Sequence, residues 1–328
     1  MPSSQSVTIS PAQPRATGAV AGKGGWVLLP AFLLAAACTP ATAALEEAPE
    51  AVQPNHSTYG TDASLAASQP DAILRYADHP RGFAELRMPQ GTKEGAGLFP
   101  LAVIYHGGCW KTGIASQAYM APLATRWQQQ GIATLNVDYR EVGDGGGWPG
   151  SFSDWAASEK LIDEIAGQHP IDRARVTLVG HSAGGLPALW LASEQGTDGP
   201  VGARQALKAR AAIILDGPGD VGSEQAAFDA LCQFSAVDPF MGGAPQRFPE
   251  RYTAISPAAH PPRLDEVLFV QAKLPAPSIP TLTRLSAGGA TVTVRENPGA
   301  SHFAIITPGN PVYQANEAAM LAVLKGGH

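Results

Sequence analysis

The stretch Gly180-His181-Ser182-Ala183-Gly184 lies between two runs of different character. The run before it, Arg175–Val179, is rich in β-branched residues, and the run after it, from Ala183 to about Gln195, has apolar residues at helical spacing. A strand, a Gly-x-Ser-x-Gly pattern and a helix in this order are typical of a nucleophile elbow, in which the serine occupies a strained turn. We therefore expect the hydroxyl of Ser182 to project above a sheet at the positive end of a helix.

The composition is that of a globular protein with a sizeable core. The chain has 328 residues, of which 45% are hydrophobic and 15% charged, and its formal net charge is −6. This length fits one large α/β domain or two small ones. The negative balance and the lack of a basic stripe argue against nucleic acid as a partner. No group of residues has metal-ligand spacing, so we expect no metal, and the expected serine chemistry needs no cofactor.

The N-terminal segment, 1–43, has the layout of a bacterial export signal. Arg15 and Lys23 precede the apolar run Trp26–Ala37, which is too short to span a bilayer as a helix. The run ends at Cys38, as in a lipoprotein signal whose cysteine becomes the lipidated first residue, although Ala35 replaces the usual larger aliphatic residue. The alternatives are ordinary cleavage after Ala43 and an alanine-rich leader without a signal. Export predicts a periplasmic or lipid-anchored protein, with a membrane contact only through the lipid.

The remainder divides into a flexible tether, 44–74, and a catalytic domain, 75–328. Within the domain, strand-like and helix-like stretches alternate, which predicts an α/β fold with a mainly parallel sheet covered by helices on both faces. Ligands bind such sheets beyond the carboxyl ends of the strands, where the elbow points. The β-rich runs cover 82–88, 99–106, 132–139, 175–180, 211–216, 267–271 and 291–296, and the helical stretches cover about 116–130, 151–168, 183–195, 278–287 and 314–325.

One long segment, about 217–262, shows no clear helical period. Segments of this length without regular structure are usually functional loops or disordered. We expect it to form a cap over the site, with a passive insertion as the alternative.

A second glycine motif, His106-Gly107-Gly108-Cys109-Trp110, directly follows the apolar run Leu101–Tyr105. Two glycines after a buried strand allow backbone N–H groups to approach a ligand closely, as in an oxyanion hole. We expect the N–H groups of Gly107, Gly108 and Ala183 to be the donors and His106 to orient the loop. The alternative is an ordinary tight turn.

The general base is expected after the last strand, where Pro298-Gly299-Ala300-Ser301-His302-Phe303 lies. A histidine on a loop at this edge can reach the elbow, so His302 is the predicted base. His181, inside the elbow, is expected to point elsewhere, and His260 belongs to the cap segment. The remaining histidines lack a suitable context.

With these motifs and Asp138-Tyr139-Arg140, the chain resembles the α/β-hydrolase superfamily over roughly residues 75–325. Within it, the chain is similar to bacterial esterases of the branch that includes kynurenine formamidases, feruloyl-esterase-like proteins and hormone-sensitive-lipase relatives. The resemblance implies an α/β-hydrolase fold and a serine hydrolase that cleaves a small carboxylic ester through an acyl-enzyme. Aryl-formamide, other amide or peptide hydrolysis by the same machinery is the alternative, because pocket shape selects the leaving group.

The triad acid departs from the family pattern. Its usual position is a loop after the strand at 267–271, but here that loop, Ala272–Pro277, has no carboxylate. Asp216 ends the preceding strand, where pancreatic-type lipases look similar, and it is the predicted acid, with Asp220 as the second candidate. The alternative is that Asp216 only caps its loop. A missing acid would favour a third hypothesis, a hydrolase-fold binding protein without catalysis.

Two further groups of residues are less defined. The aromatic side chains of Trp110, Trp148 and Phe240 are candidates to line a substrate pocket, or simply pack in the core. Cys109 and Cys232 could pair in an oxidising compartment, but their spacing cannot decide this, and two free buried thiols are the simpler expectation.

Overall fold

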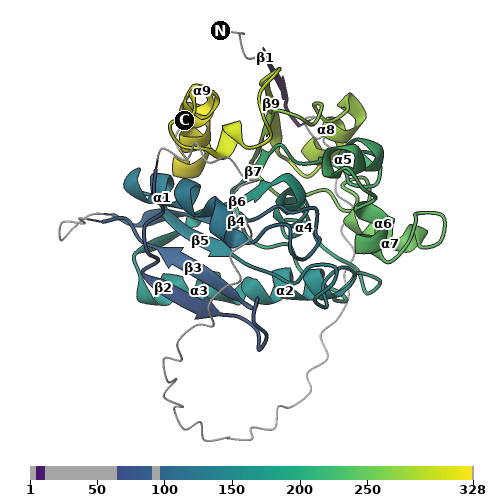
Figure 1. Ribbon diagram of the computed structural model, residues 1–328, viewed down its shortest axis with the longest axis horizontal. Coiled ribbons are helices and arrows are strands. Elements are labelled where there is room, and N and C mark those ends of the chain that lie inside the picture. The colour runs from purple at the N-terminus through teal and green to yellow at the C-terminus, as the bar shows by residue number, and fades with distance from the viewer. Residues whose placement is uncertain (1–4, 12–64, 91–96, 327–328) are drawn as a thin grey trace, which may run out of the picture. The chain divides into compact units, whose positions relative to one another are not determined.

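The computed structural model describes residues 5–11, 65–90 and 97–326. The predicted export signal beyond Pro11, with Cys38, and most of the predicted tether lie outside these residues. The described strands form one sheet in the order β1-β9-β8-β7-β6-β4-β5-β3-β2, and Figure 1 shows it running through the centre of the domain. The strands are β1 (Gln5–Ile9), β2 (Ala72–Arg75), β3 (Phe83–Arg87), β4 (Phe99–Tyr105), β5 (Ala133–Val137), β6 (Ile171–His181), β7 (Ala211–Leu215), β8 (Glu266–Gln271) and β9 (Thr291–Glu296).

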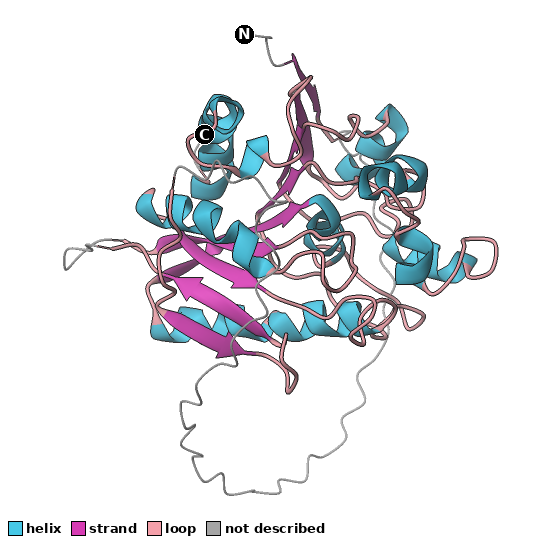
Figure 2. Cartoon of the chain, viewed as in Figure 1, coloured by secondary structure: helices cyan, strands magenta, loops and turns pink. Residues whose placement is uncertain are grey.

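The centre of the sheet is parallel, as predicted. The pairs β4–β5, β4–β6, β6–β7, β7–β8 and β8–β9 are parallel, whereas β1, β2 and β3 pair antiparallel at the two ends. Helices lie on both faces of the sheet, as Figure 2 shows. The α/β-hydrolase fold class predicted from the sequence is confirmed.

The helices have short, well-separated bounds. They are α1 (Ala121–Gln129), α2 (Gly150–Ser158), α3 (Lys160–Gln168), α4 (Gly185–Trp190), α5 (Gln225–Cys232), α6 (Val237–Met241), α7 (Pro249–Ile255), α8 (Ile279–Ser286) and α9 (Pro311–Lys325). Side-chain caps begin the last two: Ser278 accepts a hydrogen bond from the N–H of Thr281, and Asn310 accepts one from Val312. None of the described helices is both long and apolar enough to cross a membrane.

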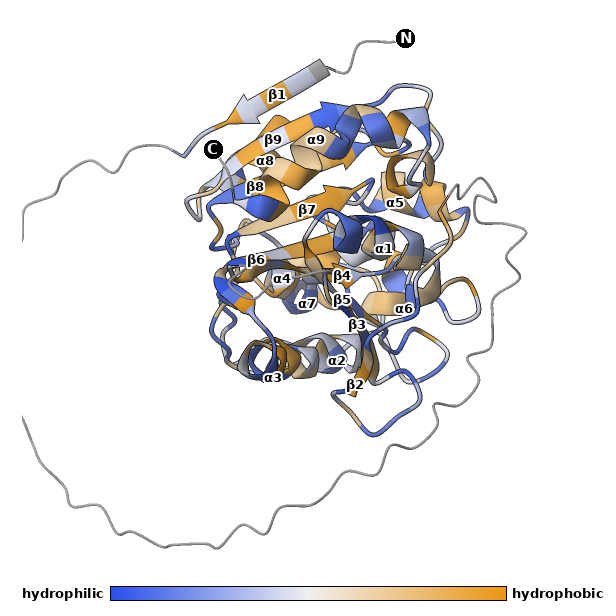
Figure 3. Ribbon diagram, turned by 90° about the vertical axis from the view of Figure 1, so that its left-hand side faces the viewer, coloured by the Kyte–Doolittle hydropathy of each residue, from blue (hydrophilic) through white to orange (hydrophobic). Residues whose placement is uncertain are grey.

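Alternate residues of the central strands face two separate cores. In β4, Ala102 and Ile104 pack toward α1 and α9, where they share a core with Trp127 and Met320. Leu101, Val103 and Tyr105 face the other side, toward α2, α3 and α4. Because both faces are buried, these strands are apolar without alternation, and Figure 3 shows the middle strands coloured as hydrophobic.

The structure differs from the sequence prediction at both ends of the sheet. Strand β2 and Ser68 belong to the domain, although they fall inside the predicted tether: the N–H of Ser68 donates to Thr125 Oγ1 at 2.8 Å. Strand β1 lies inside the predicted export signal, 1–43, and pairs with β9. Both β1 and β2 are short and half exposed, so their apolar pattern is weak.

The predicted cap segment, 217–262, contains helices α5, α6 and α7. Helices of five to eight residues complete about two turns at most, which is too short for a clear period in the sequence. Phe228, Phe240 and Tyr252 anchor this segment in the core of the sheet face that carries α2–α4. Its role as a cap stays a prediction.

Cys109 and Cys232 form a disulfide, contrary to the expectation of free thiols. The bond joins the loop after β4 to the last residue of α5, across a sequence separation of 123 residues. The two cysteines meet only in the folded chain, which is why spacing could not reveal the pair. The disulfide fixes the predicted cap segment to the loop that follows β4.

Loss of this disulfide is expected to destabilise the domain. The double variant Cys109→Ala/Cys232→Ala should lose about 2–5 kcal/mol of unfolding free energy, because a long covalent loop restricts the unfolded chain. Denaturant unfolding of both proteins measures the difference, and a reductant should lower the midpoint of the natural protein but not that of the variant. Equal midpoints without reductant would contradict the expectation.

Candidate active site

The elbow turns the chain sharply from β6 into α4. Ser182 has φ 55, a left-handed conformation that non-glycine residues seldom adopt outside constrained sites. The neighbouring glycines permit the close packing of this turn: a Cβ on Gly180 would lie 1.9 Å from the carbonyl oxygen of Gly184, and one on Gly184 would lie 2.1 Å from that of Tyr105. Ser182 is buried and lines a cavity of about 780 Å³.

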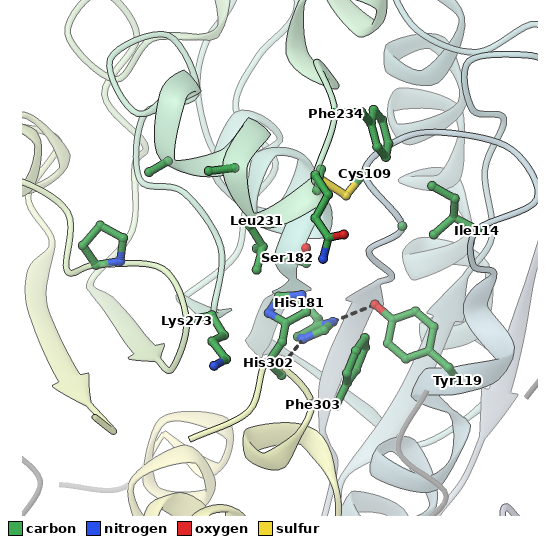
Figure 4. A pocket seen from close by; sticks show the side chains of 16 residues that line it. Cys109, Ile114, Tyr119, His181, Ser182, Leu231, Phe234, Lys273, His302 and Phe303 are labelled. Carbon is green, nitrogen blue, oxygen red and sulfur yellow. Dashed lines mark hydrogen bonds between the residues drawn. A yellow bond between two sulfur atoms is a disulfide. The ribbon is translucent and has the colours of Figure 1, made fainter. Parts of the chain in front are cut away.

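His302 lies on the loop after β9 and lines the same cavity. Its Nδ1 is 2.6 Å from Oδ2 of Asp216 and donates a hydrogen bond to this carboxylate. This leaves Nε2 as the ring nitrogen available to Ser182. Figure 4 shows the side chains of His302 and Ser182 beside the same cavity. The structure therefore brings together the three residues predicted as nucleophile, base and acid.

Asp216 follows β7 in a left-handed conformation, with φ 46, and its side chain is fully buried. Its carboxylate also accepts hydrogen bonds from three consecutive backbone N–H groups, those of Ala272, Lys273 and Leu274, at 2.8–3.0 Å. Burial raises the pKa of Asp216, but the hydrogen bonds from His302 and the backbone outweigh burial, so that the pKa lies below its ordinary value. The carboxylate is therefore ionised and oriented.

Asp220, the second candidate for the acid, is directed elsewhere. Its Oδ2 accepts from Ser256 Oγ at 3.0 Å, and its Oδ1 accepts from the N–H of Gly222 at 3.1 Å. Its contacts among the described residues stabilise the start of the 217–262 segment and do not include His302.

The loop after β4 lies directly against the elbow. A Cβ on Gly107 would be 2.8 Å from Cβ of Ser182, so only glycine fits. The N–H of Gly107, predicted as an oxyanion donor, instead donates to Tyr119 Oη at 2.5 Å. Gly108, with φ 113, lines the cavity, and its N–H has no acceptor among the described residues. Gly108 and Ala183 thus remain as candidate donors.

His106 contacts its own loop, consistent with an orienting role. Its Nδ1 is 2.6 Å from the carbonyl oxygen of Gly107, and its Nε2 is 3.0 Å from Oδ1 of Asp138. Arg81 also donates to this Asp138 oxygen at 2.8 Å. Burial raises the pKa of Asp138, but His106 and Arg81 together lower it below the ordinary value. The fully buried His106 ring stacks on Tyr139, with ring centroids 4.2 Å apart.

The aromatic residues predicted to line the pocket do not reach it. Trp110 is fully buried between Phe228 and Phe240, and its Nε1 donates to the carbonyl oxygen of Ala183. Trp148 packs on Phe152 instead. The left-handed backbone at Trp110, with φ 53, turns its indole into the core behind the loop.

The cavity wall comes mainly from residues that the sequence analysis did not single out. Its lining is largely apolar, with one lysine near His302 and the disulfide in the wall beside Gly108. Helix α5 and the chain after it supply one side, and the elbow and the segments after β4, β8 and β9 supply the rest. The main lining side chains are Ile114, Tyr119, Leu231, Phe234, Lys273 and Phe303, six of those in Figure 4.

A family model described as BD-FAE matches residues 85–270, which is more than half of the chain. The chain belongs to the BD-FAE family. The match begins in β3 and ends in β8, so it includes the loop after β4 (106–110), the elbow and Asp216. The family match confirms the resemblance to an esterase branch of the α/β hydrolases that the motifs indicated. No curated protein matches the sequence.

Solved structures similar to this BD-FAE member are named as esterases. A truncated carbohydrate esterase from gut microbiota has a TM-score of 0.58 at 17% identity, covering 80% of this chain and 99% of its own. Esterase B from Lactobacillus rhamnosis has a TM-score of 0.60 at 17% identity, with 79% and 87% covered. The thermophilic esterase Est2 from Thermogutta terrifontis has a TM-score of 0.57 at 17% identity, with 77% and 93% covered. At these identities the likeness demonstrates a common fold.

Asp216→Asn is expected to lower kcat by up to ~10⁴-fold, because an amide can hold the wrong imidazole tautomer and cannot stabilise the imidazolium. The matched control is Asp220→Asn, which should change kcat far less. Steady-state hydrolysis of an activated aryl ester measures both. The reverse ranking would assign the acid to Asp220, and two unaffected variants would indicate a Ser-His dyad.

Proposed function

We propose that this BD-FAE family member is a serine esterase that cleaves a small carboxylic ester through an acyl-enzyme. The observation that carries the proposal is the 2.6 Å hydrogen bond between His302 Nδ1 and Asp216 Oδ2. His302 lines the same cavity as Ser182. The order Ser182, Asp216, His302 along the chain is also that of α/β-hydrolase triads. The ordered acid supports catalysis over the alternative of a binding protein without catalysis.

The reaction proceeds in two halves. The oxygen of Ser182 attacks the ester carbonyl while His302 Nε2 accepts the serine proton, and Asp216 stabilises the imidazolium. The tetrahedral intermediate collapses to an acyl-serine as His302 passes the proton to the leaving alcohol. Water then attacks the acyl-serine, giving its proton to His302, and collapse of the second intermediate returns that proton to Ser182 and releases the carboxylic acid.

The developing oxyanion is stabilised by backbone donors. We assign this role to the N–H groups of Gly108 and Ala183, which lie on the two loops that meet at Ser182. In related systems each such donor contributes about 3–4 kcal/mol to the transition state. Because Ala183 is buried and the loop at Gly108 is tightly packed, with Ala115 Cβ 2.9 Å from a Cβ placed on Gly108, the donors need no rearrangement when charge develops.

The substrate class follows from the cavity. Its lining is mostly apolar, and a volume of about 780 Å³ exceeds that of a short acyl group, so the ester's alcohol portion shares the space. Among the structures with this fold, Esterase B has been solved with a tributyrin phosphonate inhibitor and Est2 with propionate or butyrate. These ligands support a short-chain ester as the substrate class proposed here.

A fluorophosphonate probe should label Ser182 and abolish hydrolysis of p-nitrophenyl butyrate. The intact protein should also release a burst of nitrophenol when deacylation is slower than acylation. Mass spectrometry locates the adduct, and Ser182→Ala serves as the unlabelled control. A label on another serine in an active preparation would sink the assignment.

We also propose that the protein is exported. The disulfide supports this proposal, because such bonds form in oxidising compartments and are rare in the cytosol. The proposal agrees with the signal-like segment that precedes Cys38.

Fractionation of bacteria that produce the full chain tests the location. The natural protein should lose Met1 and appear in the envelope or periplasm, and Cys38→Ser should release it from the membrane if Cys38 carries the lipid. A cytosolic protein that keeps Met1 would overturn export, whereas an unchanged membrane fraction after Cys38→Ser would overturn lipidation only.

A further inference from the structure

Three hydrogen bonds link the oxyanion loop to the loop of the catalytic histidine. Tyr119, from the 3₁₀ helix Gln117–Met120, accepts a hydrogen bond from the N–H of Gly107 at 2.5 Å, and its Oη is 2.7 Å from Nδ1 of His181. The other ring nitrogen of His181, Nε2, is 3.1 Å from the carbonyl oxygen of His302. Figure 4 draws the two bonds of His181 as dashed lines. Contrary to the sequence expectation, His181 points toward the site.

The partners fix where each proton lies. The carbonyl oxygen of His302 can only accept, so Nε2 of His181 carries a proton and donates it. Burial, and next the nearby His302, lower the pKa of His181 to about 3, so the ring is neutral near pH 7 and its Nδ1 is bare. The Tyr119 hydroxyl must then donate to Nδ1, and its oxygen is free to accept from Gly107. The three hydrogen bonds therefore all run the same way: Gly107 donates to Tyr119, Tyr119 to His181, and His181 to His302.

The rings of these residues are packed as well as bonded. The centroids of His181 and His302 are 4.4 Å apart, and those of Tyr119 and His181 are 5.5 Å apart. A charged His181 at this distance would disfavour the imidazolium that His302 forms during the reaction. Donation from Tyr119 to Nδ1 favours the neutral ring, which avoids that repulsion.

We propose that Tyr119 and His181 are positioning residues that fix the loop after β4, which carries the proposed oxyanion donor Gly108, relative to His302. This inference rests on the proposed esterase function. The donors of the oxyanion hole and the catalytic imidazole come from separate loops, after β4 and after β9, and a shift of about 1 Å between such groups can cost 10²-fold in rate. The series crosses the elbow through His181, so the middle residue of Gly-His-Ser links both loops to Ser182.

Two variants each remove the hydrogen bond between Tyr119 and His181 and keep the rest of the packing. Tyr119→Phe keeps the ring but removes the hydroxyl. His181→Gln keeps an N–H that can reach the carbonyl oxygen of His302, but its acceptor oxygen is at the end of the side chain and no acceptor remains at the position of Nδ1. Tyr313→Phe is the matched control, since Tyr313 is a buried tyrosine whose hydroxyl donates to the carboxylate of Glu317 on α9.

Each single variant is expected to lower kcat for p-nitrophenyl butyrate by about 10- to 100-fold with KM within about twofold, whereas Tyr313→Phe should leave kcat unchanged. The double variant Tyr119→Phe/His181→Gln should be no slower than the worse single variant, because both remove the same link. Rates are expressed per site titrated with a phosphonate, so that misfolded protein does not count. Unchanged kcat in Tyr119→Phe, or losses that multiply in the double variant, would overturn the proposal.

A spectroscopic measurement tests the link without substrate turnover. In protein labelled with ¹⁵N-histidine, His181 should show a protonated Nε2 and a bare, hydrogen-bonded Nδ1, and the Nδ1 resonance should shift in Tyr119→Phe but not in Tyr313→Phe. A protonated Nδ1 in the natural protein would overturn the inference even if the enzyme is active. An inactive natural protein with the expected resonances would instead contradict the proposed function and leave the link intact.

Discussion

The buried carboxylate of Asp216 joins three segments that are far apart in the sequence. It accepts from the imidazole of His302 and from three successive N–H groups of the loop after β8. Removal of any one partner would leave a buried charge incompletely compensated, which is costly in a protein interior. The position of His302 therefore depends on the backbone of residues 272–274 and not on their side chains. A loop without a carboxylate thus donates hydrogen bonds to the proposed triad acid, Asp216, which follows β7.

Backbone strain concentrates around the same site. Among the described non-glycine residues, positive φ angles occur at Cys109, Trp110, Ser182, Asp216 and Gln233. The first four follow the carboxyl ends of β4, β6 and β7, and Gln233 ends α5 beside the cavity. Such conformations cost about 1–3 kcal/mol each and persist where surrounding contacts over-determine them. Here the aromatic packing of Trp110, the disulfide at Cys109 and the hydrogen bonds of Asp216 supply those contacts.

The roles of residues that follow a strand in the sequence could be predicted, whereas contacts between residues far apart in the chain could not. Ser182, His302 and Asp216 each follow a recognisable strand, so that the end of that strand located them at one edge of the sheet. Tyr119 lies inside a helical stretch, and nothing in its neighbourhood indicated that its hydroxyl reaches Gly107. The disulfide and the cavity wall from α5 likewise depend on how a long segment folds back. For Trp110 the sequence left both a pocket role and core packing open, because its direction depends on a left-handed backbone that sequence does not reveal.

The outermost strand has a consequence for maturation. β1 contributes little to the core, with Val7 46% exposed and only Ile9 packed against it, and it lies four strands from β6. Cleavage at Cys38 or after Ala43 would remove residues 5–9 with the leader, and the N–H and C=O groups of β9 that pair with them would face solvent. The precursor would then have a sheet of nine strands and the processed enzyme one of eight, with the triad untouched. On the proposed processing, β1 would cover the edge of β9 in the precursor alone, and the processed chain would expose that edge to pairing with other chains.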